Sequence, residues 1–430
     1  MTFPKFYFDR SFTFESGLHV IYGESGSGKS ALINQILELE KGQEYFHLTN
    51  INRPEEFQKV FQNPDTQIIS STLGGELAFS LECRSNNQEY ISTKLASLKE
   101  KLFFECAEHR HPATLSGGEK EMLNIVTAFS VNPQLLLIDD GLSFLNVNGK
   151  QNMLGYIHNQ IVETNCIVLW LTSDCNDLQF GKTQWELSLS SFNEWNGNIS
   201  PLPAVKHKSQ SNEITIACHD LFFSYNGDRD LFNAFNMKID DFRALGITGS
   251  NGCGKTTLVK LLLHIERSES GSITLTKAGE KAAMAYLEQF PEKMIGADSL
   301  DTFVQRLVMA GKLDKYKINH AVKNLKNCQL EWEQIRYKTA LDLPWSTLRV
   351  VLTIWLLNSE YDLLILDEPT FGLGRQQVLT LTHHLRLYLK NKHLIIISHD
   401  TEFIYTFCDR VFEMDQHTII TEKNNITSNG

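Results

Sequence analysis

The sequence predicts two α/β domains, each built on a mostly parallel sheet that leads into a phosphate-binding loop. The first observation is that the pattern G-x-x-x-x-G-K-[ST] occurs twice, at residues 23–30 and 249–256. Each copy follows a short apolar strand, Leu18–Tyr22 or Ala244–Thr248, and continues into a helical pattern. That strand–loop–helix context is the one that a phosphate-binding loop requires.

The second observation is that the two halves of the chain repeat. The interval from Lys29 to Asp139 is nearly the same as the interval from Lys255 to Asp367. Each aspartate ends an apolar run of the kind that fits a strand buried on both faces of a parallel sheet. The matching intervals indicate that each half is one domain with the same order of elements.

Further strands are expected at Cys166–Leu171 and His393–Ile397, at a similar interval after each aspartate. Strands that alternate with helices predict an α/β fold. Between the halves, residues 201–212 are polar and contain two prolines, as is typical of a linker. We therefore expect a first domain at 1–200 and a second at 213–430.

Each phosphate loop contains the residue types that hold a nucleoside triphosphate and a metal ion. Glycines let backbone N–H groups wrap the phosphates, and the following helix N-terminus adds positive potential. We expect Lys29 and Lys255 to reach the β- and γ-phosphates, and Ser30 and Thr256 to hold Mg²⁺. The expected phosphate-loop residues are Gly23, Glu24, Ser25, Gly26, Ser27, Gly28, Lys29, Ser30, Gly249, Ser250, Asn251, Gly252, Cys253, Gly254, Lys255, Thr256 and Thr257.

Composition narrows the class of protein. The hydrophobic fraction of 42% in 430 residues allows each half to bury a core. The net charge of −11 argues against a body that binds nucleic acid, which usually has a basic face. No apolar run has the length of a membrane span, the N-terminus lacks a signal-peptide layout, and the eight cysteines show no framework spacing. These features predict reduced thiols and a cytoplasmic location.

The pentapeptide Leu115–Glu119, with the sequence Leu-Ser-Gly-Gly-Glu, lies between the first phosphate loop and the apolar run that ends in Asp139. In this position it resembles the signature of ATP-binding cassette ATPases. In that family two nucleotide domains pack head to tail, and each ATP lies between the phosphate loop of one and the signature of the other. The resemblance implies that Ser116, Gly117, Gly118 and Glu119 contact the ATP held by the second phosphate loop.

Two segments resemble the glutamine loop of the same family. Residues 60–67 are similar to the version in energy-coupling-factor and cobalt-type importer ATPases, and residues 286–292 are a diverged copy. The resemblance implies that Gln62 and Gln289 reach Mg²⁺ and the attacking water. The residues that follow each glutamine would form a helical subdomain that contacts a membrane partner.

The motifs that the second domain contributes to the site at its own phosphate loop are complete. The resemblance assigns Mg²⁺ binding to Asp367, as to Asp139 in the first domain, and the polarisation of water to Glu368. His399 matches the switch histidine of the family. Tyr225 precedes the second phosphate loop, at the position where the family stacks an aromatic ring on adenine. Glu368, His399, Gln289 and Lys255 are therefore the expected catalytic residues.

The other composite site has lost residues on both sides. Asp140 stands where Glu is expected and is one methylene short, about 1.5 Å. Misplacement by roughly 1 Å can cost ~10²-fold in rate. Ser173 replaces the histidine, and Leu343–Thr347 stands where a second signature is expected. There Pro344 removes a hydroxyl and a donor, and Trp345 places an indole where the family has glycine.

Three classes of protein use tandem cassettes without membrane spans. A chromosome or DNA-repair ATPase needs long coiled-coil arms, and the interval between Lys29 and Leu115 is too short for them. The glutamine loop and the short linker favour the second class, a peripheral ATPase that binds separate transmembrane subunits on the cytoplasmic face of a membrane and drives import of a vitamin or metal ion. The alternative is a soluble tandem cassette that acts in translation or regulation.

Overall fold

The computed structural model describes residues 6–8, 12–37, 53–84, 87–104, 107–145, 147–188, 191–197, 202, 214–225, 229–250, 252–390, 392–416 and 418–421. The chain divides into two compact units, one of residues 1–199 with 372–375 and one of residues 200–371 with 376–430. Of the predicted linker, only Leu202 lies among the described residues, and Asn251 of the second phosphate loop lies outside them.

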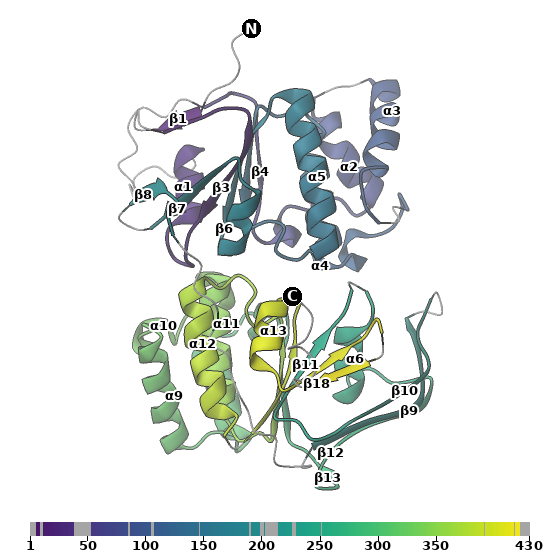
Figure 1. Ribbon diagram of the computed structural model, residues 1–430, viewed down its shortest axis with the longest axis vertical. Helices are drawn as coiled ribbons and strands as arrows, with labels where there is room; N and C mark the ends of the chain where they lie inside the picture. Colours follow the sequence, from purple (N-terminus) through teal and green to yellow (C-terminus); the bar gives the residue numbers. More distant parts are fainter. Residues whose placement is uncertain are drawn as a thin grey trace, which may run out of the picture. The chain divides into compact units, whose positions relative to one another are not determined.

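The first unit is built on a six-stranded sheet in the order β4-β5-β6-β3-β7-β8 (Figure 1). All neighbouring strands in it are parallel except β7 and β8. A two-stranded antiparallel sheet lies at the start of the chain. The strands are β1 (Phe6–Phe8), β2 (Phe12–Phe14), β3 (Gly17–Tyr22), β4 (Phe57–Val60), β5 (Leu135–Asp139), β6 (Ile167–Thr172), β7 (Thr183–Leu187) and β8 (Phe192–Glu194).

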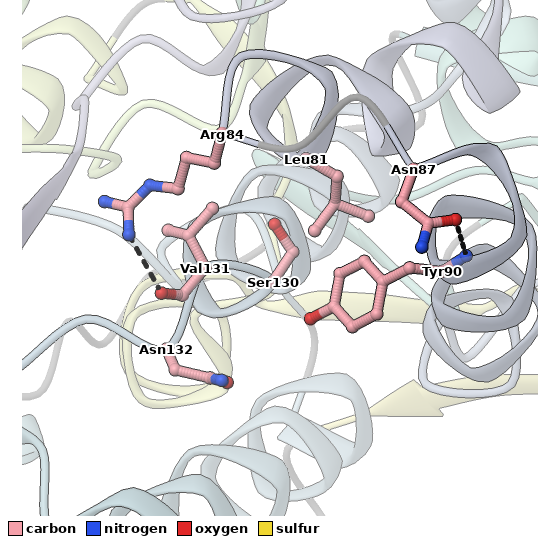
Figure 2. Close-up of a pocket in the computed structure, with 7 residues that line it drawn as sticks. All are labelled: Leu81, Arg84, Asn87, Tyr90, Ser130, Val131 and Asn132. Atoms are coloured by element: carbon pink, nitrogen blue, oxygen red, sulfur yellow. Dashed lines mark hydrogen bonds between the residues drawn. The ribbon is translucent and has the colours of Figure 1, made fainter.

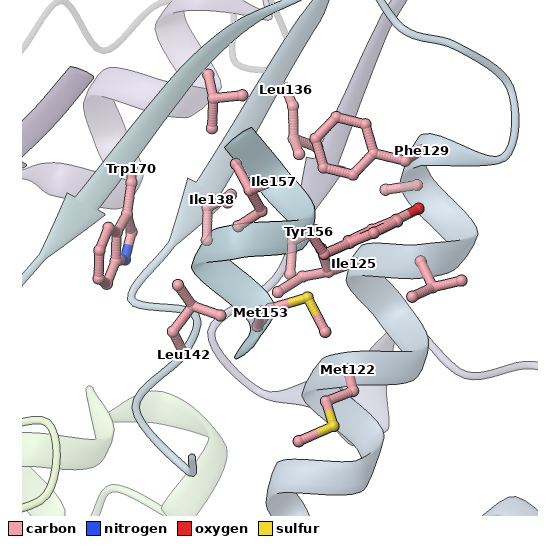
Figure 3. Close-up of a cluster of buried hydrophobic side chains, with 14 of the residues drawn as sticks. Met122, Ile125, Phe129, Leu136, Ile138, Leu142, Met153, Tyr156, Ile157 and Trp170 are labelled. Atoms are coloured by element: carbon pink, nitrogen blue, oxygen red, sulfur yellow. The ribbon is translucent and has the colours of Figure 1, made fainter. Parts of the chain in front are cut away.

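Helices cover both faces of this sheet. One face packs on α1, and the other packs on α2, α4 and α5 through a large apolar cluster that includes Phe129, Tyr156 and Trp170 (Figure 3). Because β5 and β6 are buried along their whole length, they are apolar up to their last residue rather than alternating. The helices are α1 (Lys29–Ile36), η1 (Pro64–Thr66), α2 (Leu73–Glu82), α3 (Gln88–Lys99), η2 (Pro112–Thr114), α4 (Gly117–Phe129), α5 (Val147–Thr164) and η3 (Cys175–Phe180).

The second unit repeats the sheet order, as β14-β15-β16-β11-β17-β18, and adds a four-stranded antiparallel sheet in the order β10-β9-β12-β13. Strands β14, β15, β16, β11 and β17 are parallel, and β18 is antiparallel to β17. The strands are β9 (Ile214–Tyr225), β10 (Arg229–Ile239), β11 (Ala244–Thr248), β12 (Ser270–Lys277), β13 (Glu280–Lys281), β14 (Met284–Leu287), β15 (Leu363–Asp367), β16 (His393–Ile397), β17 (Arg410–Glu413) and β18 (Thr418–Thr421).

A group of helices follows β14, in the position that α2–α4 hold in the first unit. The apolar residues 350–357 lie inside one of them, α11, as expected for a buried helix. The helices of this half are α6 (Lys255–Leu262), α7 (Glu292–Ile295), α8 (Leu300–Met309), α9 (Lys315–Asn327), α10 (Trp332–Ile335), η4 (Ala340–Asp342), α11 (Trp345–Leu357), α12 (Arg375–Tyr388) and α13 (Thr401–Phe407). None of the helices in the described ranges combines the length and apolar character that crossing a membrane requires.

The two phosphate loops join β3 to α1 and β11 to α6, as the sequence predicts. The residue before each helix is a glycine in the left-handed region, with φ of 94° at Gly28 and 102° at Gly254. Only glycine adopts this conformation without a steric cost, so the last glycine of each motif is required by the backbone itself.

Candidate nucleotide site

The carboxyl ends of the central strands bring the predicted motifs together in each unit. In both sheets a single strand separates the phosphate-loop strand from the strand that ends in the predicted metal-binding aspartate. The residues that follow parallel strands meet at one edge of the sheet, where α/β proteins bind their ligands. The structure therefore places Lys29 with Asp139 and Lys255 with Asp367 at equivalent edges.

Asp367 lies at the centre of the second site. The hydroxyls of Thr256 and Tyr286 both donate to its Oδ2, at 3.1 and 3.0 Å. Burial, followed by the charge of neighbouring Glu368, raises the pKa of Asp367 to about 7. A buried carboxylate beside a threonine hydroxyl is an oxygen donor set that suits Mg²⁺. Tyr286, on β14, is a contact that the sequence analysis missed.

Glu368 is held by the segment that follows β16. The Ser398 hydroxyl donates to Oε2 at 2.8 Å, and the His399 backbone N–H donates to Oε1 at 3.0 Å. The His399 ring Nε2 is 3.6 Å from Oε1. Burial, with the nearby Lys255 charge, lowers the pKa of His399 to about 4, so the ring is neutral near pH 7 and does not form an ion pair with Glu368. Burial also raises the pKa of Glu368.

Lys255 folds back on its own loop. Its Nζ donates to the carbonyls of Gly249 and Ser250 at 2.8 and 2.9 Å, which leaves the ammonium beside the backbone that would wrap a phosphate. Cys253 is partly buried, and burial raises the pKa of its thiol, so the thiol is protonated near neutral pH. The Cys253 thiol therefore adds no charge to this loop.

Tyr225 ends β9 with an exposed ring. Its hydroxyl lies 3.3 Å from the Thr257 hydroxyl, at the start of α6, and its ring meets Phe223 edge-on with the centroids 4.8 Å apart. The residue is 44% exposed, so part of its surface is accessible to a ligand. Stacking on adenine stays a prediction that this geometry permits.

The first unit also provides a metal-compatible carboxylate. Asp139 is buried, and its Oδ1 has no hydrogen-bond partner among the described residues. Burial, followed by the charge of Asp140, raises the pKa of Asp139 to about 6, while a hydrogen bond from Ser30 opposes that rise. An orphaned carboxylate oxygen beside a serine hydroxyl fits a divalent cation.

Asp140 lies in a hydrogen-bond network that differs from the one around Glu368. Its oxygens accept the Ser173 backbone N–H at 2.5 Å and the Ser173 hydroxyl at 2.8 Å. Gln62 Nε2 donates to the same carboxylate at 3.3 Å. Lys29 Nζ is 3.5 Å from Asp140 and donates to the Ser173 hydroxyl at 2.8 Å. The loss of a methylene and of a histidine thus gives a buried cluster that engages the phosphate-loop lysine.

The signature of the first unit begins α4 with a capping box. The Ser116 hydroxyl accepts the Glu119 N–H at 3.3 Å, and the Glu119 carboxylate accepts the Ser116 N–H at 2.8 Å. Ser116 is exposed, so its hydroxyl remains accessible to a ligand. A Cβ on Gly117 would lie 2.7 Å from the Phe144 ring, which explains why this position requires glycine. Glu119 therefore caps helix α4.

In the second unit, the segment in the signature position has a different structure. Helix α11 begins at Trp345 after Pro344, and no side chain caps it. The second turn of this helix contains the buried Arg349, and the second turn of α4 contains the buried Glu121. The sequence analysis assigned neither residue. The sequence does contain a signal that could have identified them: each is a charged residue at the same position of its helix, just before the helix turns apolar.

A separate pocket of about 460 Å³ lies on the helical part of the first unit (Figure 2). Arg84 crosses one wall and donates to the Val131 carbonyl at 3.4 Å, and Asn87 accepts the Tyr90 N–H at 3.3 Å. The pocket is lined by Leu81, Arg84, Asn87, Tyr90, Ser130, Val131 and Asn132. No residue of a phosphate loop lines it, so it is distinct from the nucleotide site.

Two repeated sheets with two phosphate loops define a tandem P-loop nucleoside triphosphatase. The chain belongs to the ABC transporter family, whose profile matches residues 8–143 and 232–371, more than half of the chain. It is an ATP-binding cassette ATPase with two cassettes, as the sequence analysis predicts.

The relatives match this chain over most of its length. An ABC transporter ATP-binding protein of Streptococcus mutans is 24% identical, covering 95% of this chain and 86% of the relative. A protein of the same description from Bacillus thuringiensis is 22% identical, covering 93% and 85%. Among solved structures, a model of ribosome-bound archaeal Pelota and ABCE1 matches with TM-score 0.69 and 18% identity, covering 93% of this chain and 72% of that one. An RNase-L Inhibitor structure matches with TM-score 0.60 and 17% identity, covering 96% and 84%. These structural likenesses show the fold alone.

Proposed function

We propose that this ATPase is the motor subunit of a membrane importer of the energy-coupling-factor type, with one active and one degenerate composite ATP site. The proposal that the two sites are unequal rests on one contrast. Glu368 accepts hydrogen bonds from Ser398 and His399, whereas Asp140 is bonded to Ser173 and lies beside Lys29. The transport role is supported by relatives described as ABC transporter ATP-binding proteins over most of both chains.

The active site would be completed by the two units pairing head to tail. Ser116, Gly117 and Gly118 would then cover the γ-phosphate of the ATP held by the Lys255 loop. The exposed Ser116 hydroxyl and the backbone N–H groups at the start of α4 supply suitable donors. Opposite the first phosphate loop, Pro344 would offer neither a hydroxyl nor a backbone N–H, and the Trp345 indole would fill the space that a glycine leaves open.

In the active site each residue would have a distinct task. Glu368 would polarise the attacking water, and Lys255 would stabilise the charge that develops on the γ-phosphate. Thr256 and Asp367 would hold Mg²⁺, with Gln289 completing the set; the metal would neutralise charge on the phosphates. The neutral His399 ring, 3.6 Å from Glu368, can donate or accept a hydrogen bond without adding charge.

Coupling to a membrane partner requires a surface on the helical segments after the glutamine loops. Those segments carry exposed apolar side chains in both units, and such residues are candidates for contact with a protein partner. In the first unit they are Ile69, Phe79, Tyr90 and Phe103, and in the second Val308, Met309, Tyr316, Tyr337 and Leu341. Their presence supports docking of transmembrane subunits there. Selection of the vitamin or metal-ion cargo would lie in another subunit.

The proposal is tested by purifying the tagged Glu368→Gln protein with ATP and Mg²⁺ from detergent-solubilised cells. We expect a multi-span membrane protein to co-purify and to stimulate the ATPase activity of the wild-type chain after reconstitution. Recovery instead on ribosomes, in a pool that survives a high-salt wash, would overturn the importer function and establish the translation alternative.

A further inference from the structure

The guanidinium of Arg349 contacts three backbone carbonyls that come from two different loops. Nη1 donates to the carbonyls of Glu368 and Phe371, the former at 2.9 Å, and Nη2 donates to the carbonyl of Gln289 at 2.6 Å. The side chain is only 1% exposed. One buried cation therefore bridges the glutamine loop and the loop that begins with Glu368.

An aromatic layer lies on the same bridge. The Trp345 ring meets Phe290 with centroids 5.6 Å apart and Phe371 with centroids 6.2 Å apart, both edge-on. The Arg349 guanidinium lies 5.2 Å from the centre of the Phe371 ring, within the range of a cation–π contact. The indole that replaces a signature glycine is thus packed against loops of its own unit.

The matching position of the first unit has the opposite charge. Glu121 accepts the N–H groups of Ser143 and Phe144, at 3.1 and 3.0 Å, in the turn that follows Asp140. Both bonds go to that single turn, whereas the bonds of Arg349 also reach the glutamine loop. The two helices therefore both support the turn after the central strand, and Arg349 adds a connection to a second loop.

A buried guanidinium is costly to keep in place of an apolar side chain of similar volume. Burial lowers the pKa of Arg349 to about 10, against the attraction of Glu368, Asp367 and Glu292, so the charge is retained at neutral pH. The planar group spreads its donors over separate nitrogens and so can reach carbonyls from separate segments at once, whereas the Lys ammonium has all its donors on one nitrogen and an apolar residue has none.

We propose that Arg349 is a positioning residue that clamps Gln289 to Glu368, so that movement of the glutamine loop and orientation of the water-polarising carboxylate change together. The inference rests on the proposed catalytic role of Glu368. In this proposal the start of α11, which stands in the signature position, stabilises the catalytic loops of its own unit.

The test compares the steady-state kinetics of Arg349→Met and Arg349→Lys with wild type. We expect Arg349→Met to lower kcat by about 10- to 100-fold while KM for MgATP stays near the wild-type value, because the clamp orients Glu368 without touching ATP. Arg349→Lys keeps the charge but cannot hold all three carbonyls, so it should recover part of kcat. If Arg349→Met does not fold, a fall in kcat at constant KM in Arg349→Lys supports the clamp.

Trp332→Leu is the matched control. Trp332 packs on Trp355 of the same helix as Arg349, with ring centroids 4.8 Å apart. It should lower the melting temperature and leave kcat unchanged. The clamp is overturned if Trp332→Leu loses as much kcat as Arg349→Met, if KM rises in step with the fall in kcat, or if the Arg349 variants turn over normally. Persistent turnover in Glu368→Gln would instead overturn the proposed role of Glu368.

Discussion

Asp140 and Glu368 occupy the same backbone position in the two units. Both lie in the left-handed region, with φ of 49° and 50°, and both donate their N–H at 2.8 Å to the strand beside them, at Leu171 and Ile397. Non-glycine residues rarely adopt this conformation, so its recurrence shows that the two loops have one backbone design. The difference between the sites therefore lies in the side chains.

We predict that Glu368→Gln abolishes steady-state ATP turnover, because it removes the carboxylate that we propose polarises water and changes the shape of the side chain little. Asp140→Asn should alter turnover several-fold at most, since the Asp140 carboxylate is already bonded to Ser173. Phosphate release at saturating MgATP measures both variants. Equal damage from the two substitutions would disprove a single active site.

The first site should bind nucleotide without hydrolysing it. Its Lys29, Ser30 and Asp139 are in place, whereas Asp140 and Ser173 replace the hydrolytic residues. A nucleotide that binds only the closed state stabilises it by about 2.7 kcal/mol at 100 times Kd. We expect two nucleotides per chain on the Glu368→Gln protein after rapid desalting, and one when Lys29→Ala is added.

Recovery of a single nucleotide from Glu368→Gln, together with wild-type behaviour of Lys29→Ala, would mean that the first site has no role in closure. Asp140→Asn provides a second check. Removing the charge 3.5 Å from Lys29 should tighten binding of the triphosphate at the first site, because the lysine no longer has a competing anion.

Glu121→Gln should change stability in a pH-dependent way. Burial raises the pKa of Glu121 from 4.5 to about 8, so the folded chain holds a proton that the unfolded chain releases between these values. For an acid with a raised pKa, stability is present below the unfolded pKa of 4.5 and is lost as the pH rises towards 8. The uncharged glutamine avoids this loss.

We therefore expect the melting temperature of Glu121→Gln, measured relative to wild type by scanning fluorimetry, to increase from pH 5 to pH 8. Using the difference between the two proteins cancels the titration of all other groups. A difference that is constant across this range, or that falls, would show that Glu121 is ionised in the folded chain throughout.

The exposed apolar residues of the second unit should be needed for docking and not for hydrolysis. Met309 and Leu341 are 84% and 94% exposed, so Met309→Asp with Leu341→Asp should fold normally and keep basal ATPase activity. Co-purification of the membrane partner should be lost. Val162→Asp, at a residue of α5 that is 68% exposed, is the control and should retain the partner. Loss of the partner in both would point to a general effect of added charge.

The sequence predicted the parallel sheets well, because each central strand is a continuous apolar run next to a motif of fixed geometry. The strand at 244–248 and the strand at 393–397 have the predicted bounds, and the strands at 17–22 and 167–172 are offset from their predicted bounds by a single position. The phosphate loops were equally predictable, since glycines with positive φ must stand at set positions.

The side-chain contacts between distant segments could not be predicted from the sequence. Arg349 looks like a stray charge in an apolar helix until its three carbonyl partners are placed around it, and none of them is encoded by a local pattern. The bond from Tyr286 to Asp367 likewise depends on two strands pairing in one register. Spacing finds ligands on loops, but it does not find the residues that hold those loops.

The buried cluster of Lys29, Asp140 and Ser173 also constrains how this chain can evolve. Lengthening Asp140 to Glu alone would push the carboxylate against the hydroxyl and ammonium that now enclose it, and replacing Ser173 by His alone would strip the aspartate of a donor. Either substitution alone disturbs the cluster without restoring the glutamate–histidine pair that the second unit has. The asymmetry between the two cassettes is therefore entrenched, because the route back requires these two changes together as well as restoration of the signature at Leu343–Thr347.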